Sequence, residues 1–189
     1  FTESELSTSG GGGVVHWDNL TSVPGELADG DDDTLPILPG TNWGLHVVTT
    51  VDSEDWVGAW TSITVGADGL PVMSYFDDTN DDLKVAHCPD LACSSATTHI
   101  VDSGGDVGRH SSIAVGVDRL PVISYLDDTN DDLKVAHCSN IECSTATLAT
   151  VDSGGDVGSY PSIAVGVDGL PVISYLDETN EDLKVAHCS

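Results

Sequence analysis

The sequence predicts an all-β protein built from tandem four-stranded antiparallel blades, the repeating unit of a β-propeller. Residues 101–139 and 151–189 align without gaps at a spacing of 50, and residues 51–100 form a more diverged copy. Within each copy, hydrophobic residues alternate with a period of two, and short polar or glycine-containing turns separate the alternating runs. A β-solenoid or a prism of three sheets is the alternative architecture.

Composition restricts the functions that the chain can serve. Its 189 residues include 32 acidic and 5 basic side chains, which give a formal net charge of −27. This charge excludes ordinary nucleic-acid binding, because phosphate contacts need clustered Lys and Arg. No apolar run approaches the roughly 20 residues that a membrane-spanning helix needs, so no membrane insertion is expected. The chain begins at Phe1 instead of Met, and we expect a processed or partial chain that is secreted or surface-attached.

The N-terminal residues differ from the repeats. Residues 1–13 are rich in Ser, Thr and Gly and are expected to form a flexible arm. Residues 14–44 are acidic, and in them Trp17, Leu20 and Val23 recur every third residue. This spacing suits an extended fibre better than a globular strand or helix. The alternative is an extended linker with a few buried anchors.

A longer pattern in this region supports the fibre interpretation. The run 14–24, followed by Ala-Asp-Gly and further acidic residues at 28–34, resembles a segment common in phage tail fibres and bacterial surface fibres. The resemblance implies that residues 14–44 form part of an elongated stalk. The same region contains the N-glycosylation sequon Asn-Leu-Thr at Asn19, which makes Asn19 a candidate glycosylation site.

The repeats occupy the remainder of the chain, as residues 51–100, 101–150 and 151–189. In the second repeat, four strands are expected at residues 112–117, 121–126, 132–138 and 145–151. The other two copies have Asp-Gly between the first two strands, which is a strong hairpin signal. An acidic turn joins the second and third strands, and the loop 152–158 leads to the next repeat. The third repeat stops before its fourth strand.

The repeats also resemble a known group of proteins. The run Ser-Ile-Ala-Val-Gly-Val-Asp-Gly-Leu-Pro-Val-Ile-Ser-Tyr at 162–175 and the run Asp-Leu-Lys-Val-Ala-His at 182–187 are similar to blade repeats of bacterial secreted and surface proteins. Those repeats are in turn distantly similar to the Asp-box repeats of sialidase-type propellers. The resemblance implies the fold and not sialidase activity, because Arg109 and Arg119 are too few to form an arginine cluster for a sialic-acid carboxylate.

Two cysteine pairs are predicted to form disulfides. Cys88 and Cys93, and likewise Cys138 and Cys143, share the spacing C-x4-C at the same place in successive repeats, and local disulfides are expected in an exported chain. Cys188 lacks a partner because its repeat is cut short. Zinc is the alternative, with the histidine before each first cysteine as a further ligand, although a zinc site needs four converging ligands.

The acidic hairpin tips are candidate calcium sites. Each offers several carboxylate and amide oxygens, the ligands that Ca²⁺ prefers. The candidate ligands are Asp77, Asp78, Asn80, Asp82, Asp127, Asp128, Asn130, Asp132, Asp177, Asn180 and Asp182. Asp and Asn also favour turns through local hydrogen bonds, so a solvated acidic turn is the alternative. Calcium is the cofactor that we expect from these tips if they bind a ligand.

The sequence contains no recognisable catalytic motif, neither a nucleophile elbow nor a metalloprotease helix. We therefore expect a non-enzymatic, extracellular structural or adhesive protein. The alternative is a carbohydrate-binding, lectin-like propeller that binds cell-surface glycans, with Tyr125 and Tyr175 as stacking surfaces. Ordinary core packing is the other interpretation of these two tyrosines.

A spare strand is expected ahead of the first repeat. Residues 45–51 fall in the register of 145–151, so they correspond to the fourth strand that the third repeat lacks. The residues of this donor strand that we expect to mediate assembly are Leu45, Val47, Val48 and Thr50. Two closures of the open edge of the third repeat are expected as alternatives: the strand returns to its own chain and closes a ring, or it adds to the next molecule, which is the closure we favour. Head-to-tail donation that does not close into a ring produces a filament, so the chain itself is the first expected partner.

Overall fold

The structure is a computed structural model in which residues 48–188 are described. Eleven β-strands account for the regular structure of this part of the chain. Among these residues, no helix is long and apolar enough to cross a membrane. The expected arm (1–13), the stalk-like segment (14–44) with Asn19, and Leu45 and Val47 of the expected donor strand lie outside the described residues.

The strands form three antiparallel sheets in sequence order. Sheet A contains β1 (Val57–Val65), β2 (Pro71–Asp77), β3 (Asp82–His87) and β4 (Thr97–Asp102). Sheet B contains β5 (Val107–Val115), β6 (Pro121–Asp127), β7 (Asp132–Cys138) and β8 (Ala146–Asp152). Sheet C contains β9 (Val157–Val165), β10 (Pro171–Asp177) and β11 (Asp182–His187). The prediction of four-stranded antiparallel units is therefore confirmed for the first two repeats, and the third has three strands.

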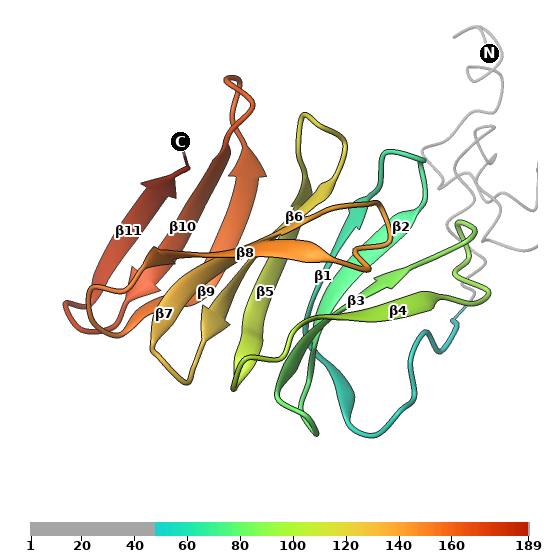
Figure 1. Ribbon diagram of the computed structural model, residues 1–189, viewed down its shortest axis with the longest axis horizontal. Coiled ribbons are helices and arrows are strands. Elements are labelled where there is room, and N and C mark those ends of the chain that lie inside the picture. The colour runs from blue at the N-terminus through green and yellow to red at the C-terminus, as the bar shows by residue number, and fades with distance from the viewer. Residues whose placement is uncertain (1–47, 189) are drawn as a thin grey trace, which may run out of the picture. The chain divides into compact units, whose positions relative to one another are not determined.

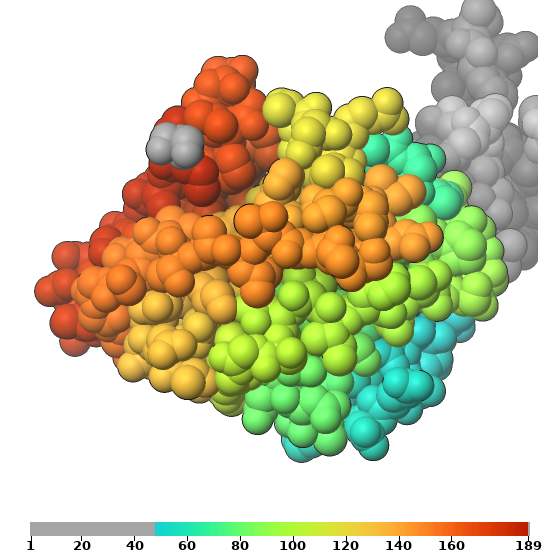
Figure 2. All heavy atoms as spheres, in the orientation of Figure 1, coloured from blue at the N-terminus to red at the C-terminus, as the bar shows by residue number. Residues whose placement is uncertain are grey.

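Sheet B lies between sheets A and C (Figure 1). The first strand of each sheet contacts the first strand of the next, and it also packs on the second and third strands of the preceding sheet. In the space-filling view (Figure 2), the zones of the three sheets follow each other in chain order across the visible face, from cyan to red. Each repeat therefore covers one face of the repeat before it.

The hydrophobic core lies between successive sheets. One buried cluster joins Val72, Leu83 and Val85 of sheet A to residues of sheet B that include Ile113 and Tyr125. A second cluster repeats the arrangement one sheet later, between Val122, Leu133 and Val135 of sheet B and Val157, Ile163, Ile173 and Tyr175 of sheet C. Strand β6 of sheet B and strand β3 of sheet A are buried at every position, whereas every residue of β11 in sheet C is exposed or half-buried.

The first strand of each repeat begins earlier than the sequence predicted. Strand β5 starts at Val107, whereas the alternating pattern indicated residue 112. Register shifts interrupt its pairing with β6 around Arg109, and His110 has a φ of 55°. These are the features of a β-bulge, which breaks the period-two pattern and thereby hid the first half of the strand.

A glycine at the start of each first strand allows the sheets to approach closely. Gly108 has a φ of 107°, and a Cβ at this position would lie 2.7 Å from Cα of Leu83 in the preceding sheet. Gly158 has the same relation to Leu133, with a corresponding distance of 2.6 Å. Only glycine leaves room for the neighbouring backbone at this distance.

Candidate functional site

The most regular polar feature of the structure links each sheet to the next. Asp102, the last residue of β4 in sheet A, accepts hydrogen bonds at Oδ2 from Tyr125 Oη (2.7 Å) and Lys134 Nζ (2.6 Å) in sheet B. Asp152 accepts in the same way from Tyr175 (2.6 Å) and Lys184 (2.5 Å) in sheet C. We call each such trio an Asp–Tyr–Lys clip.

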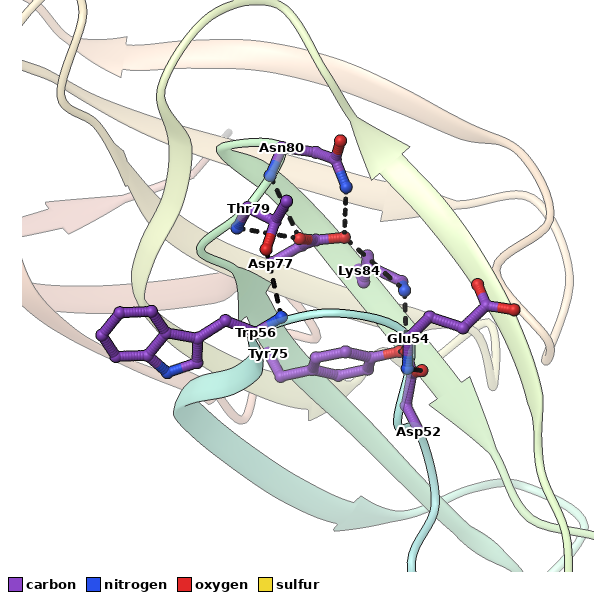
Figure 3. Close-up of polar contacts among 8 residues, drawn as sticks. All are labelled: Asp52, Glu54, Trp56, Tyr75, Asp77, Thr79, Asn80 and Lys84. Atoms are coloured by element: carbon purple, nitrogen blue, oxygen red, sulfur yellow. Dashed lines mark hydrogen bonds and ion pairs between the residues drawn. The ribbon is translucent and has the colours of Figure 1, made fainter.

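The third clip involves a residue that precedes sheet A. Asp52 accepts from Tyr75 Oη at 2.6 Å and from Lys84 Nζ at 2.7 Å (Figure 3). Asp52 thus precedes sheet A in the same way that Asp102, at the end of β4, precedes sheet B and Asp152, at the end of β8, precedes sheet C. Strand alternation places the tyrosine and the lysine opposite each other on adjacent strands, as for Tyr75 and Lys84. The aspartate comes from the chain immediately before that sheet, which for Asp102 and Asp152 is the last strand of the preceding sheet.

The clips hold charged groups at neutral pH. Burial alone would raise the pKa of Asp102, but hydrogen bonds from Lys134 and Tyr125 outweigh it, and the pKa of Asp102 lies below its ordinary value. Hydrogen bonds from Lys184 and Tyr175 lower the pKa of Asp152 to about 2. The carboxylates are therefore ionised, and the Oδ2 atom of each accepts from donors of the next sheet.

The tyrosines of the clips form part of the core. Tyr125 is fully buried and Tyr175 is nearly so. Burial, together with the hydrogen bond to Asp152, raises the pKa of Tyr175 to about 12, so its hydroxyl stays protonated as a donor. The hypothesis that Tyr125 and Tyr175 are stacking surfaces for a sugar is wrong, because the sheet interface encloses their rings.

The acidic hairpin tips are held by hydrogen bonds of their own. Asp77 accepts from the backbone amides of Thr79 and Asn80, and Asn80 Nδ2 donates to its second oxygen at 3.1 Å. The same Asx turn recurs with Asp127 and Asn130 and with Asp177 and Asn180. These contacts are the local turn chemistry that was the alternative to calcium binding.

The other candidate calcium ligands lie around the same tips. Asp82, Asp132 and Asp182 pair in register with Asp77, Asp127 and Asp177 across the hairpin. Burial and the Asp77 carboxylate raise the pKa of Asp82. Asp78 and Asp128 occupy the turns themselves. Within residues 48–188, no group of three or more His, Cys, Asp or Glu side chains is placed to hold a metal ion, and calcium binding stays a prediction.

The cysteines pair as the spacing predicts. Disulfides join Cys88 to Cys93 and Cys138 to Cys143, each with a Cα–Cα distance of 4.9 Å. Cys188 forms no disulfide in the described part of the chain, and burial raises the pKa of its thiol. Because both complete pairs are oxidised, they are not available as the zinc ligands of the alternative interpretation.

Each sheet also has a histidine bonded to an aspartate of its first hairpin turn. Nε2 of His87 lies 2.8 Å from Oδ2 of Asp68. The corresponding pairs, His137 with Asp118 and His187 with Asp168, have distances of 2.7 Å. The histidines that the zinc hypothesis invoked therefore tie the end of the third strand to this turn.

A row of rings crosses the three sheets at one position of the repeat. His110 of β5 stacks on Tyr160 of β9 with ring centroids 4.1 Å apart, and it meets the ring of Trp60 of β1 edge-on at 5.1 Å. Burial and the nearby Arg109 lower the pKa of His110, so its ring is neutral at pH 7. Its Nδ1 accepts a hydrogen bond from the backbone amide of Tyr160 at 3.3 Å. We call Trp60, His110 and Tyr160 the aromatic row.

Sequence reasoning missed the aromatic row. A signal was present, because position 110 differs from position 160 between otherwise near-identical copies, yet both positions and position 60 hold a ring. The three residues have positive φ values of 46°, 55° and 51°. Each therefore lies in the β-bulge of its strand, where no simple alternation indicates the direction of a side chain.

The described part of the expected donor strand, from residue 48, forms no strand in the single chain. Val48 and Thr50 belong to no strand, and Val48 is 94% exposed. Thr49 donates a side-chain hydrogen bond to the carbonyl of Ala92 at 3.2 Å. Donation of this segment to another molecule stays a prediction.

Comparison with known proteins bears on the fold. No known protein family and no curated protein matches the sequence. Among solved structures, a protein of unknown function from Dyadobacter fermentans DSM 18053 is 12% identical, with a TM-score of 0.54 over 67% of this chain and 36% of that chain. This similarity concerns the fold alone.

Two further solved structures are more distant. An alpha-L-arabinofuranosidase from Lactobacillus brevis is 12% identical, with a TM-score of 0.49 over 70% of this chain and 50% of that chain. A fucose lectin from Kordia zhangzhouensis, solved with methyl-fucoside, is 6% identical, with a TM-score of 0.41 over 66% of this chain and 89% of that chain. The present chain thus spans half or less of the length of the first two similar proteins.

Proposed function

We propose that this chain is a non-enzymatic extracellular protein with a structural or adhesive role, and that it serves as a subunit of a surface fibre or filament. Its sheets would follow one another as the blades of a β-propeller do. The two disulfides support an oxidising, extracellular environment. The resemblance of residues 14–44 to fibre stalks supports the same role.

The observation that carries this proposal is the identical use of polar side chains in each repeat. The carboxylate, phenol and ammonium groups of the three Asp–Tyr–Lys clips bind one another across the sheet interfaces. A catalytic site usually sets a few groups apart from their surroundings, with pKa values matched to a reaction. Here the ionised groups are tied into ion pairs that stiffen the stack, which suits a mechanical or scaffolding role.

Assembly would use the outer edge of β11. In sheet B, β7 pairs with β8 so that Leu133 lies opposite Asp152. The same register would place Asp52 of another molecule opposite Leu183. Asp52 already binds Tyr75 and Lys84 of its own chain, as Asp152 binds the corresponding residues of sheet C. The segment before sheet A therefore has the chemistry of a fourth strand that lacks a neighbour.

Electron microscopy and sedimentation of the full chain test this proposal. We expect elongated oligomers or filaments from the intact chain. Val47→Pro combined with Val48→Pro removes two consecutive backbone donors from the expected donor strand and should abolish them. Because Val48 is exposed in the single chain, the melting temperature of the monomer should not change. An intact chain that stays monomeric at high concentration would contradict the proposal.

A second candidate function is glycan binding by exposed aromatic side chains. Trp56 is 73% exposed and Tyr160 is 67% exposed, and an aromatic ring with a free face can stack on an apolar sugar surface. A glycan array should then lose its signal with Trp56→Ala or Tyr160→Ala. The control is Leu91→Ala, which alters an equally exposed residue (78%) that has no ring. An array without any bound glycan would remove this candidate.

A further inference from the structure

We propose that copies of this chain bind one another head to tail through the faces at the two ends of the sheet stack, an inference that rests on the proposed role as an assembly subunit. The C-terminal end surface is the outer face of sheet C at Leu183 and Val185. The N-terminal end surface is the outer face of sheet A at Ile63 and Val65. The partner that fits both surfaces is a second copy, whose N-terminal end surface would cover Leu183 and Val185.

The C-terminal end surface matches positions that are buried elsewhere in the stack. Leu183 is 80% exposed, whereas the corresponding Leu133 is fully buried. Val185 is 63% exposed and Val135 is 8% exposed. The sequences around these positions are the same, and the difference is that sheet C covers Leu133 and Val135. Leu183 and Val185 thus form one half of an interface, and no sheet covers them in the described part of the chain.

The N-terminal end surface is the reciprocal half of that interface. Ile63 is 65% exposed and Val65 is 64% exposed. At the positions that correspond to Ile63, Ile113 is 6% exposed and Ile163 is 9% exposed, because each packs on the preceding sheet. Tyr75 and Ala86, which lie on the same face of sheet A, are buried. The chain therefore exposes this half of the interface at Ile63 and Val65, and the other half at Leu183 and Val185.

Backbone geometry at the ends agrees with this pairing. Gly108 and Gly158 lie against the backbones of Leu83 and Leu133, so a Cβ at either glycine would collide with the preceding sheet. Gly58 occupies the same position in sheet A with a φ of 91°, but a Cβ there would meet nothing within 4 Å. In the single chain, Gly58 therefore has the positive φ of the two interface glycines, although no backbone of another sheet lies against it. The partner's Leu183 would be that neighbour.

The hydrogen bonds across the internal interfaces also form a series that could continue at each end of the stack. The backbone amide of Ile113 donates to Ser62 Oγ, and that of Ile163 donates to Ser112 Oγ, each at 3.2 Å. Continuing the series pairs Ser162 Oγ with the backbone amide of Ile63 from a second copy. The interface is therefore specified by directional contacts in addition to apolar area.

The aromatic row adds a third matching feature. His110 has a ring on each side, Trp60 on one and Tyr160 on the other. Tyr160 is 67% exposed, and within residues 48–188 His110 is its only ring partner. Head-to-tail binding would place the partner's Trp60 beside Tyr160 and would extend the row across the junction.

Charge determines the conditions under which this association should occur. Two chains with a formal charge of −27 each repel one another. Salt screens repulsion between exposed charges, with a Debye length of about 10 Å at 0.1 M and about 3 Å at 1 M, whereas the contact itself is apolar. Association should therefore strengthen with salt, which is the opposite of an interface held by ion pairs.

Sedimentation equilibrium of the full chain at low and high sodium chloride tests the inference. We expect concentration-dependent association that strengthens in high salt. Leu183→Asp and Ile63→Asp should each weaken it at least tenfold without lowering the monomer melting temperature, since both side chains are exposed. Val117→Asp is the control, because Val117 is 73% exposed but lies in a hairpin turn away from the ends. Gly58→Ala should also weaken association.

A mixing experiment distinguishes head-to-tail binding from other modes. Leu183→Asp keeps its N-terminal end surface and Ile63→Asp keeps its C-terminal one. The mixture should give a one-to-one heterodimer that grows no further, although each variant alone is monomeric. Failure of the mixture to associate, or association of each variant as strong as that of the intact chain, would overturn the inference.

The same samples separate this inference from the strand-pairing proposal. If the Val47→Pro and Val48→Pro variant associates normally while the end-surface variants do not, the end surfaces stand and strand pairing fails. If the end-surface variants associate normally while the proline variant does not, strand pairing stands and the inference is wrong. An intact chain that is monomeric at every salt concentration would overturn both.

Discussion

Asp102 joins sheet A to sheet B through one carboxylate oxygen. This oxygen accepts from Tyr125 and Lys134, and the Asp102 side chain is 4% exposed. Asp152 makes the same contacts one repeat later, but its Lys184 partner is 35% exposed, compared with 14% for Lys134. The two clips have the same chemistry but differ in burial. Comparing them therefore measures how burial changes the contribution of a clip to the free energy of unfolding.

We predict that Asp102→Ala lowers the free energy of unfolding by about 2 kcal/mol, because it leaves the largely buried Lys134 ammonium with only the more distant carboxylate of Asp127, at 3.5 Å. Asp152→Ala should cost under about 1 kcal/mol, since Lys184 reaches water. Urea denaturation of the monomer measures both values. Equal costs would mean that burial does not determine the contribution of the clip.

Ser124 shows how a single substitution between repeats changes a buried contact. Its hydroxyl is buried and has no hydrogen-bond partner in the described part of the chain. The corresponding Ser74 bonds Ser111 of the next sheet at 2.8 Å. In the third repeat, Pro161 stands at the position of Ser111. Proline has no side-chain hydroxyl, so Ser124 loses the partner that Ser74 keeps.

Ser124→Ala should therefore be neutral or stabilise the fold by up to about 1 kcal/mol, because it removes an unsatisfied polar group. Ser74→Ala should destabilise by about 1 kcal/mol, since it removes a buried hydrogen bond. Thermal and urea unfolding of the two variants provide the comparison. A larger loss for Ser124→Ala than for Ser74→Ala would contradict this account.

At the level of the strands, the sequence predicted the second, third and fourth strand of the second repeat closely. Strand β6 was expected at 121–126 and spans Pro121–Asp127, and β7 has its expected bounds. These strands follow a strict alternation between recognisable turns. The first halves of the first strands β1, β5 and β9 were not predicted. In each strand a β-bulge, at Trp60, His110 or Tyr160, changes the face on which the side chains lie.

Burial of the faces could not be predicted from the alternation. The pattern of one repeat suggests a strand with one buried face, but β6 in sheet B is buried throughout. This follows from the packing of sheets A and C on its two sides, a non-local property that residues within one repeat do not encode. For the same reason, the sequence left open whether Tyr125 and Tyr175 face a sugar or the core.

The close approach of sheets predicts a difference between two glycines. Gly108→Ala should destabilise the monomer by at least about 2 kcal/mol, because it adds a collision with Leu83 to the cost of a positive φ. Gly58→Ala should cost about 1 kcal/mol, since only the backbone strain applies. Unfolding curves at concentrations too low for association measure this difference. Equal losses would show that the sheets do not meet at Gly108.

For the molecule as a whole, acidity should affect stability in two directions. Burial and nearby carboxylates raise the pKa values of Asp82 and Asp132, so the destabilisation caused by their charged forms in the folded state is lost as the pH falls through those raised values. The pKa values of Asp52, Asp102 and Asp152 lie below their ordinary values, so the stability that they contribute is present above about pH 4. That contribution is lost as the pH falls towards the folded-state values, about 2 for Asp152.

The melting temperature of the monomer should therefore pass through a maximum near pH 4 to 5. It should decline slowly towards neutral pH, where the net charge of −27 opposes the compact state, and steeply below pH 4. Calorimetry at low protein concentration would follow this profile. A melting temperature that rises steadily from pH 3 to pH 7 would mean that raised carboxylate pKa values and charge repulsion are not important.

The account as a whole depends on each sheet being covered by the sheet that follows it. Hydrogen exchange of β7 and β11 measures this directly, since peptides from the two strands can be distinguished by Asp131 and Glu181. At monomeric concentration, we predict strong protection of β7 and weak protection of β11. Protection of β11 should approach that of β7 when concentration and salt are raised. Equal protection in the dilute monomer would show that β11 is already covered within one chain, which contradicts the account.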